Sequence, residues 1–277
     1  GRITATGSLV YTNVTEHVKI GDAPADFQRL APSFTVSLQP WQEQLLFLRL
    51  MYKSTFRMPT FNDLYYYRLG NRSLRPEKAN EYNMGITWSR SFSSFLNYLS
   101  VTVDGYYNDV TDKIVAFPTT YAWKMANYGK VHVTGMDATL AAAASLGKNT
   151  VLVVSGGYTW QKAIDLTDAT SKSYKDQLPY TPKHSGNVSA VLEMPWVNVG
   201  YSIVGVSERY SMSQNIPENR IDGYMEHTVS LSRNFSFRHC KLRLQAEIIN
   251  LTDTQYDVIK YYPMPGRSWR LTGTIEF

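Results

Sequence analysis

The stretch that decides the fold is Ser268 to Phe277, at the carboxyl end of the chain, and it reads S-W-R-L-T-G-T-I-E-F. Its residues alternate between apolar or small side chains and polar ones, which is the pattern of a strand with two different faces. One face carries Leu271, Gly273, Ile275 and Phe277, and the other carries Arg270, Thr272, Thr274 and Glu276. The same pattern recurs upstream in segments too long for ordinary strands, and it therefore predicts the closing strand of a membrane barrel.

About twelve such segments follow one another along the chain. They are expected at 3–12, 33–39, 46–53, 82–89, 101–108, 136–144, 152–160, 188–194, 197–203, 224–231, 241–248 and 268–277. Short turns such as Gly147-Lys148-Asn149 and Pro195-Trp196 alternate with long loops, expected at 19–32, 57–79, 118–127, 165–181, 212–219 and 252–267. Short turns on one side and long loops on the other are typical of outer-membrane barrels.

The composition is compatible with a barrel in a membrane. Hydrophobic residues make up 43% of the chain, yet the mean hydropathy is −0.29 and no apolar run approaches the roughly 18 residues of a spanning helix. The 20 tyrosines among only 18% charged residues suit strands that end in aromatic girdles. A soluble β-sandwich would show the same alternation, so periodicity alone leaves that alternative open. A propeller is disfavoured, because twelve strands would make only three four-stranded blades.

Catalytic and nucleic-acid functions find little support in the sequence. The formal charge is +5, but Lys and Arg are scattered and form no basic stripe with aromatic residues. The single cysteine, Cys240, and the five histidines show no metal-ligand spacing and no triad pattern. We therefore expect no enzyme, no resident cofactor, no metal site and no nucleic-acid partner. One of the histidines, His227, is expected to face lipid.

Four stretches resemble the sequence boxes of TonB-dependent outer-membrane receptors. They are F-R-M-P-T-F-N-D-L-Y-Y at 56–66, G-N-R-S-L-R-P-E at 70–77, L-P-Y-T-P-K-H at 178–184, and N-L-T-D at 250–253 followed by Tyr256 and by P-G-R at 265–267. Their order along about the last 220 residues is specific to that superfamily. The terminal Phe277 is similar to the aromatic residue that such proteins present to the barrel-assembly machinery.

The resemblance implies a 22-stranded barrel with an amino-terminal plug inside it. This chain looks like the carboxyl-terminal half of such a barrel, residues 1–277, without the plug domain. The implied function is that of a receptor in the bacterial outer membrane, which imports a scarce nutrient complex with energy relayed by TonB. Cobalamin or a ferric siderophore is the expected cargo, because the histidine usual in haem receptors is missing between Arg57 and Glu77. The implied partners are membrane lipids, the receptor's own plug, the TonB system and the barrel-assembly machinery.

Two sets of candidate residues follow. Aromatic side chains give rigid contact surface and arginine grips anions, so long-loop residues of these types are candidate ligand contacts: Tyr65, Tyr66, Tyr67, Arg68, Asn71, Arg72, Tyr121, Trp123, Tyr174 and Tyr180. Charged residues on the polar strand face are expected to face the lumen and the plug: Arg49, Asp104, Asp137, Glu193, Arg243, Glu247, Arg270 and Glu276. For each residue, ordinary loop packing or hydrogen bonding within the wall is the alternative.

A second function remains open at this stage. A complete twelve-stranded outer-membrane barrel could act as a passive pore, or as a phospholipase with a serine and a histidine at the lipid-facing surface.

Overall fold

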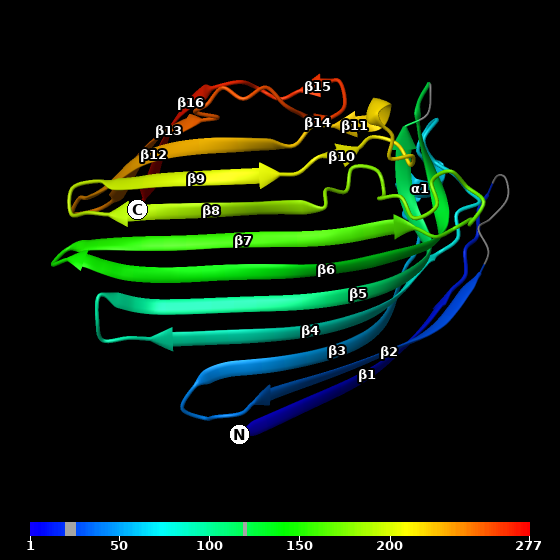
Figure 1. Ribbon diagram of the computed structural model, residues 1–277, viewed down its shortest axis with the longest axis horizontal. Helices are drawn as coiled ribbons and strands as arrows, with labels where there is room; N and C mark the ends of the chain where they lie inside the picture. Colours follow the sequence, from blue (N-terminus) through cyan, green and yellow to red (C-terminus); the bar gives the residue numbers. More distant parts are fainter. Residues whose placement is uncertain (20–25, 119–120) are drawn as a thin grey trace.

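The computed structural model describes residues 1–19, 26–118 and 121–277. Twelve long strands form one antiparallel sheet in which every strand pairs with its neighbours in chain order. Figure 1 shows the sheet curving as a trough, with β1 and β16 at its two edges. The strands are β1 (Arg2–Val14), β2 (Phe27–Gln39), β3 (Leu45–Arg57), β4 (Glu77–Ser91), β5 (Leu96–Pro118), β6 (Trp123–Gly147), β7 (Thr150–Asp165), β8 (His184–Glu193), β9 (Asn198–Val206), β12 (Tyr224–Ser236), β13 (Lys241–Ile249) and β16 (Ser268–Glu276).

The expected all-β class, the twelve strands and their order are confirmed. Several strands are longer than the alternation suggested. Residues 27–32 and 123–127, expected in loops, belong to β2 and β6, because pairing with β1 and β5 satisfies their backbone groups. The parts of those two expected loops at 20–25 and 119–120 lie outside the described residues.

Small elements stand on the loop side of the sheet, where the sequence predicted only irregular loops. They are the helix α1 (Phe61–Tyr65), the 3₁₀ turn η1 (Pro217–Asn219), the ribbon β10 (Arg209–Tyr210) with β11 (Arg220–Ile221), and the ribbon β14 (Asp257–Ile259) with β15 (Tyr262–Pro263). Among the described residues, no helix has both the length and the hydropathy that crossing a bilayer demands.

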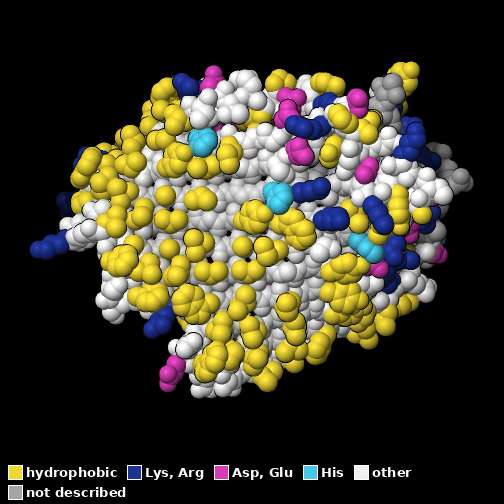
Figure 2. All heavy atoms as spheres, in the orientation of Figure 1, with side chains coloured by type: hydrophobic (Ala, Val, Ile, Leu, Met, Phe, Trp, Pro, Cys, Tyr) yellow, Lys and Arg dark blue, Asp and Glu magenta, His cyan; other side chains and the backbone are white. Residues whose placement is uncertain are grey.

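The two faces of the sheet differ in chemistry. On the outer face, large apolar side chains such as Leu50, Met84 and Leu271 are more than half exposed. Figure 2 shows this face, where hydrophobic side chains cover a broad area and charged ones gather toward the loop side and the turns. A soluble protein rarely leaves so large an apolar surface uncovered. This surface is what a membrane barrel turns to lipid, and it decides against the sandwich, which would have buried it against a second sheet.

The best-buried packing lies at the loop end of the polar face, not in a central core. Leu178, from the loop between β7 and β8, packs on a cluster of small strand residues. The cluster consists of Ala79, Val110, Val131, Val133 and Ala163. The loop therefore folds back over the polar face and covers the wall beneath it.

The hairpin of β5 and β6 is the longest in the molecule, and it bends. Asp112 has φ 56, a left-handed conformation that is uncommon outside glycine, and the pairing of β5 with β6 skips Asp112 and Gly129. The Asp112 carboxylate accepts a hydrogen bond from Arg75 Nε at 2.8 Å, and the Asp112 carbonyl accepts one from Asn127 Nδ2 at 2.7 Å. Figure 1 shows the end of this hairpin turning out of the line of the other strands.

Candidate functional site

A cavity of about 440 Å³ lies at the loop end, beside the bent hairpin. Its walls come from the tip of β5 and β6, from the loop before β8, from β10 and from β14. Those elements stand far apart in the strand order, and the bend at Asp112 places the hairpin tip against β14. The lining residues are Lys113, Val115, Ala116, Trp123, Tyr128, Leu178, Pro179, Tyr180, Thr181, Arg209, Val258 and Ile259.

Two of the predicted contact residues meet in this cavity. The ring centroids of Trp123 and Tyr180 lie 6.0 Å apart, within the range of favourable aromatic pairing. Trp123 was expected in a loop but begins β6, so its position is fixed by the strand. Tyr180 has φ 56, and its backbone N–H donates to the Tyr210 carbonyl at 2.7 Å. Burial raises the pKa of the Tyr180 phenol, which keeps it a neutral hydrogen-bonding group.

The most unusual residue of the cavity is Arg209, which the sequence analysis missed. It is only 4% exposed, and its Nη2 donates to the carbonyls of Asp257 at 2.6 Å and Val258 at 3.1 Å. Its Nη1 is buried and has no hydrogen-bond partner among the described residues. A guanidinium in such a place is costly unless an acceptor completes its bonding, and an anionic oxygen is the strongest acceptor available.

The guanidinium of Arg209 also packs on an aromatic ring, that of Tyr224. Its guanidinium carbon lies 5.8 Å from the centroid of the Tyr224 ring, which stacks on Tyr256 at 3.9 Å. The Tyr256 hydroxyl donates to Glu226 Oε2 at 2.5 Å. Burial, followed by this bond to a carboxylate, raises the pKa of Tyr256 above its ordinary value. The guanidinium is therefore held in place by two carbonyls and a ring, and no carboxylate of the described residues neutralises it.

The loop that carries most of the predicted contacts lies beside the cavity but lines no part of it. Leu64 and Leu74 bury against Ile114 of β5, and Met125 N–H donates to the Leu69 carbonyl at 3.0 Å. A capping box at Thr60 starts α1 within this loop. The loop thus packs on the hairpin that forms one wall of the cavity.

The individual candidates in that loop differ in their surroundings. Tyr65 packs against the buried Leu64, Leu74 and Ile114. Its hydroxyl has no partner among the described residues, and the Arg72 guanidinium carbon lies 5.3 Å from the centroid of its ring. Asn71 donates to the Met125 carbonyl at 3.2 Å, which makes it a residue that holds the loop. Tyr66, Tyr67 and Arg68 are exposed.

The other two candidates stand apart from the cavity. Tyr121 is 97% exposed, and Tyr174 contacts Lys175, whose Nζ lies 5.3 Å from the ring centroid. Neither lines the cavity. Of the ten predicted contact residues, Trp123 and Tyr180 line the cavity.

Some residues predicted for the lumen pair with each other along the polar face. Arg49 Nη2 donates to Asp104 Oδ1 at 3.0 Å, although β4 separates their strands. Gly85 makes this possible, because a Cβ there would lie 1.9 Å from Asp104 Oδ1. On β13 and β16, Arg270 Nε donates to Glu247 Oε2 at 2.6 Å.

The remaining residues of that set occupy polar-face positions and form no ion pair within the part of the chain that the structure describes. Asp137 accepts from the Thr159 hydroxyl at 2.7 Å. Glu193 and Glu276 stand opposite Asn198 and Lys241 in the register, and Arg243 stands opposite Thr274. In the described part of the chain, no group of three or more histidine, cysteine, aspartate or glutamate residues could hold a metal ion.

The curved sheet, its lipid-type outer face and the cavity among its long loops define a transmembrane β-barrel of the receptor type. The chain belongs to the family described as TonB dependent receptor-like, beta-barrel, which it matches over residues 1–251. The members of this family are receptors and transporters.

Known proteins resemble the chain over most of its length. It is 26% identical over 230 residues to the vitamin B12 transporter BtuB of Photobacterium profundum, covering 80% of this chain and 34% of that protein. The ferric preacinetobactin receptor BauA of Acinetobacter baumannii has the same fold, with a TM-score of 0.71 at 13% identity over 99% of this chain and 40% of that one. The ferric-catecholate import receptor Fiu of E. coli K12 also has this fold, with a TM-score of 0.65 at 20% identity, covering 90% of this chain and 35% of that one. The chain spans about a third of the length of the curated relatives that it matches.

Proposed function

We propose that this chain is the ligand-capturing, carboxyl-terminal part of the barrel of an outer-membrane receptor that imports a scarce nutrient complex. Family membership supports the receptor class. The relatives named as a vitamin B12 transporter and as ferric-siderophore receptors support cobalamin or a ferric siderophore as the cargo. The partners in this proposal are membrane lipids, a plug domain, TonB and the barrel-assembly machinery, with Phe277 as the assembly signal.

The observation that carries the proposal is the cavity with Arg209. Val115, Val258 and Ile259 offer an apolar wall, Trp123 and Tyr180 offer aromatic faces, and Arg209 offers a positive charge that no described carboxylate neutralises. A ligand that is partly apolar and carries an anionic oxygen would satisfy all three. A cavity of about 440 Å³ would hold one part of such a nutrient complex, with the remainder in the mouth of the barrel.

In this proposal the chain binds, orients and admits its cargo. The loops capture the complex at the cell surface, and the polar-face residues, among them Asp137 and Arg243, contact the plug in the lumen. Energy transmitted by TonB then moves the plug so that the cargo passes. Nothing in this sequence of steps requires this chain to make or break a covalent bond.

The test is equilibrium binding and uptake by the receptor that contains this chain. Cyanocobalamin, ferric citrate and a ferric catecholate are offered in turn to the purified receptor, and growth on the limiting nutrient is compared in cells with and without TonB. We expect one of these compounds to bind and its uptake to need TonB. Arg209→Met should weaken binding about tenfold or more, since a hydrogen bond to a charged group contributes roughly 1.5–3 kcal/mol.

The matched control is Tyr121→Ala, which removes a loop aromatic that lies outside the cavity. It should leave affinity within about twofold. Uptake that is independent of TonB, or affinity equally insensitive to Arg209→Met and Tyr121→Ala, would contradict the proposal. Steady conductance of the purified protein would instead favour a passive pore.

A further inference from the structure

A second apolar hollow lies on the outer face, away from the loop cavity. It occupies about 690 Å³ across β7, β8, β9 and β12. In the register, Tyr158 stands opposite Gly186, Gly186 opposite Gly205, and Gly205 opposite Met225. Two neighbouring glycines between a tyrosine and a methionine leave a groove in the otherwise filled apolar surface. Val188 and Ile203 bound it on the turn side.

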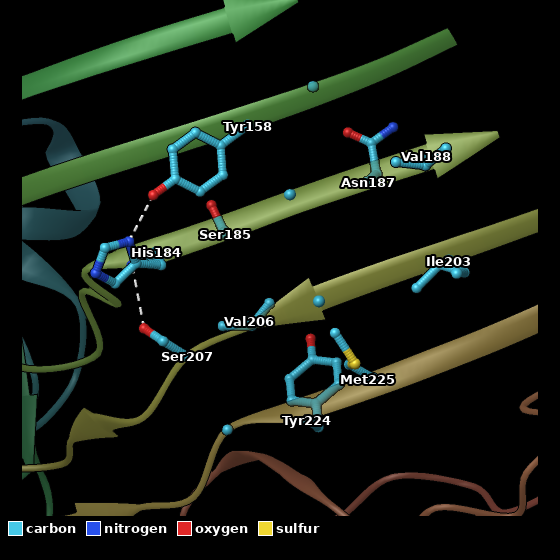
Figure 3. A pocket seen from close by; sticks show the side chains of 14 residues that line it. Tyr158, His184, Ser185, Asn187, Val188, Ile203, Val206, Ser207, Tyr224 and Met225 are labelled. Atoms are coloured by element: carbon cyan, nitrogen blue, oxygen red, sulfur yellow. Dashed lines mark hydrogen bonds between the residues drawn. The ribbon is translucent and has the colours of Figure 1, made fainter. Parts of the chain in front are cut away.

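The loop-side end of the groove is polar. Tyr158 and His184 point toward each other there, and the Tyr158 hydroxyl lies 2.7 Å from His184 Nδ1 (Figure 3). The His184 backbone N–H donates to the Ser207 hydroxyl at 3.0 Å, which fixes the start of β8. When the Tyr158 hydroxyl donates to Nδ1, the ring proton lies on Nε2, which can donate to a further partner.

A lysine stands next to this histidine on the same face. Trp160 is opposite His184, and Lys162 lies two residues farther along β7, so Lys162 and His184 are diagonal neighbours. Lys162 is exposed, and no ion pair joins it to a carboxylate in the described part of the chain. Figure 2 shows basic side chains beside a histidine near the centre of this face.

Among the described residues, the same arrangement of tyrosine and histidine occurs three times on the outer face. Each tyrosine hydroxyl lies within hydrogen-bond distance of a histidine Nδ1 on the next long strand of its sheet. The pairs are Tyr107 with His132, Tyr158 with His184, and Tyr201 with His227. Amphipathic rings of this kind suit the boundary between lipid tails and headgroups. Of the three, the pair at Tyr158 adjoins the glycine groove.

We propose that this groove binds a phosphorylated membrane lipid, with one acyl chain over Gly186 and Gly205 and the phosphate at His184 and Lys162. The inference rests on the proposed membrane orientation of the outer face. An acyl chain matches the apolar walls, and a phosphate matches the positive charge and the donor at one end. The groove is continuous with the surface that faces lipid, so the lipid can enter from the bilayer without passing through water.

The test uses native mass spectrometry of the detergent-purified receptor titrated with phosphatidic acid, with phosphatidylcholine as the comparison lipid. Gly205→Leu places an apolar side chain in the groove, and its Cβ meets only Met225, at 3.7 Å. It should weaken the first phosphatidic acid binding event about tenfold. Lys162→Ala combined with His184→Ala should reduce the preference for phosphatidic acid over phosphatidylcholine about fivefold.

The matched control is Gly273→Leu, another outer-face glycine whose Cβ would meet only Leu244 at 3.6 Å. Equal lipid binding by Gly205→Leu, Gly273→Leu and the natural receptor would overturn the proposal. A dimer that Gly205→Leu abolishes would overturn it too, because a second copy would then occupy the groove. Nutrient binding measured on the same samples separates this result from the proposed function, which stands if nutrient binds while lipid does not. If the receptor stayed monomeric without detergent, the assignment of the outer face to the membrane would itself be wrong.

Discussion

At the scale of single residues, Gly85 determines whether one ion pair can form on the polar face. It stands between Arg49 and Asp104 and leaves the room in which their side chains meet across a strand. The pair is more than one third exposed on both sides, so solvent screens it and its contribution is small. The two residues lie on β3 and β5, so their side chains must pass over β4 to meet. Gly85 of β4 leaves the space for this, whereas residues on adjacent strands would have no strand between them.

Gly85→Ala is expected to push Asp104 away and to destabilise the barrel by about 1 kcal/mol. The free energy of unfolding is measured by urea denaturation of the receptor in detergent, with tryptophan fluorescence as the signal. In an Asp104→Ala background the same substitution should cost nothing further, because the contact is already gone. Gly7→Ala is the control, since a Cβ at Gly7 meets nothing within 4 Å. Equal effects of Gly85→Ala in both backgrounds would contradict the explanation.

Tyr256 should titrate later than the other tyrosines as pH rises. Its folded pKa lies above the ordinary value of about 10, because the phenol is buried and donates to Glu226. Its stabilising contribution is therefore fully present below about pH 10 and is lost as pH rises through the folded pKa. Absorbance of tyrosinate during a pH titration checks this. Glu226→Gln should bring one tyrosine back toward the ordinary range, and an unchanged titration curve would refute the assignment.

At the scale of elements, the loops depend on a few capping contacts. Asn250 directly follows β13, has φ 52 and is fully buried. Its side chain donates to the Thr254 carbonyl and accepts from the Thr254 N–H, both at 2.9 Å. Asparagine tolerates the left-handed conformation better than most residues, and here its amide also completes the turn.

We expect Asn250→Ala to loosen the loop of residues 251–267 more than Asn250→Gly does. Alanine loses both hydrogen bonds and strains the backbone, at a cost of about 2–4 kcal/mol, whereas glycine keeps the backbone conformation. The rate of limited proteolysis in that loop of the folded receptor shows which of the two variants loosens the loop more. Ligand affinity should fall in parallel, because β14 carries Val258 and Ile259 of the cavity. A reversed order of the two variants would show that backbone strain is not the cause.

Thr60 makes a similar contribution to α1. Its hydroxyl accepts from the Asp63 N–H at 3.2 Å, and the Asp63 carboxylate accepts from the Thr60 N–H at 2.8 Å. Thr60→Ala should reduce protection of residues 61–66 in hydrogen exchange, by about 1 kcal/mol of local stability. Protection of the long strands should be unchanged, and Thr60→Ser, which keeps the hydroxyl, serves as the control. A global loss of protection would contradict this local role.

The strands could be predicted from the sequence because alternation is a local property. The extra length of β5 and β6 could not, since residues 123–127 lack strict alternation and are strand only by pairing with β5. Arg209 was missed for the same reason. Its hydrogen-bond partners Asp257 and Val258 belong to another element, and no residue close to Arg209 in the sequence indicates this contact. Trp123 and Tyr180 were candidates on residue type alone, and the fold places both in the cavity wall.

On the scale of the whole molecule, the orientation of the wall can be tested through its tryptophans. Trp269 lies on the outer face and is 74% exposed, whereas Trp123 lines the loop cavity. In bilayers that contain brominated lipid, variants that retain only Trp269 should be strongly quenched and variants that retain only Trp123 weakly. Fluorescence intensity against brominated-lipid fraction measures this. Equal quenching of the two would contradict the orientation proposed above.

The bend at Asp112 also bears on how the protein acquires its activity. It brings the tip of β5 and β6 to the cavity that β14 also lines, so the cavity is closed by segments separated by about half of the chain. Contacts between such distant segments form late, because the entropy of closing a long loop must be overcome first. A partly assembled wall can hold many of its strand pairs and still have no binding site. In the proposed receptor, ligand binding would then mark the end of barrel assembly.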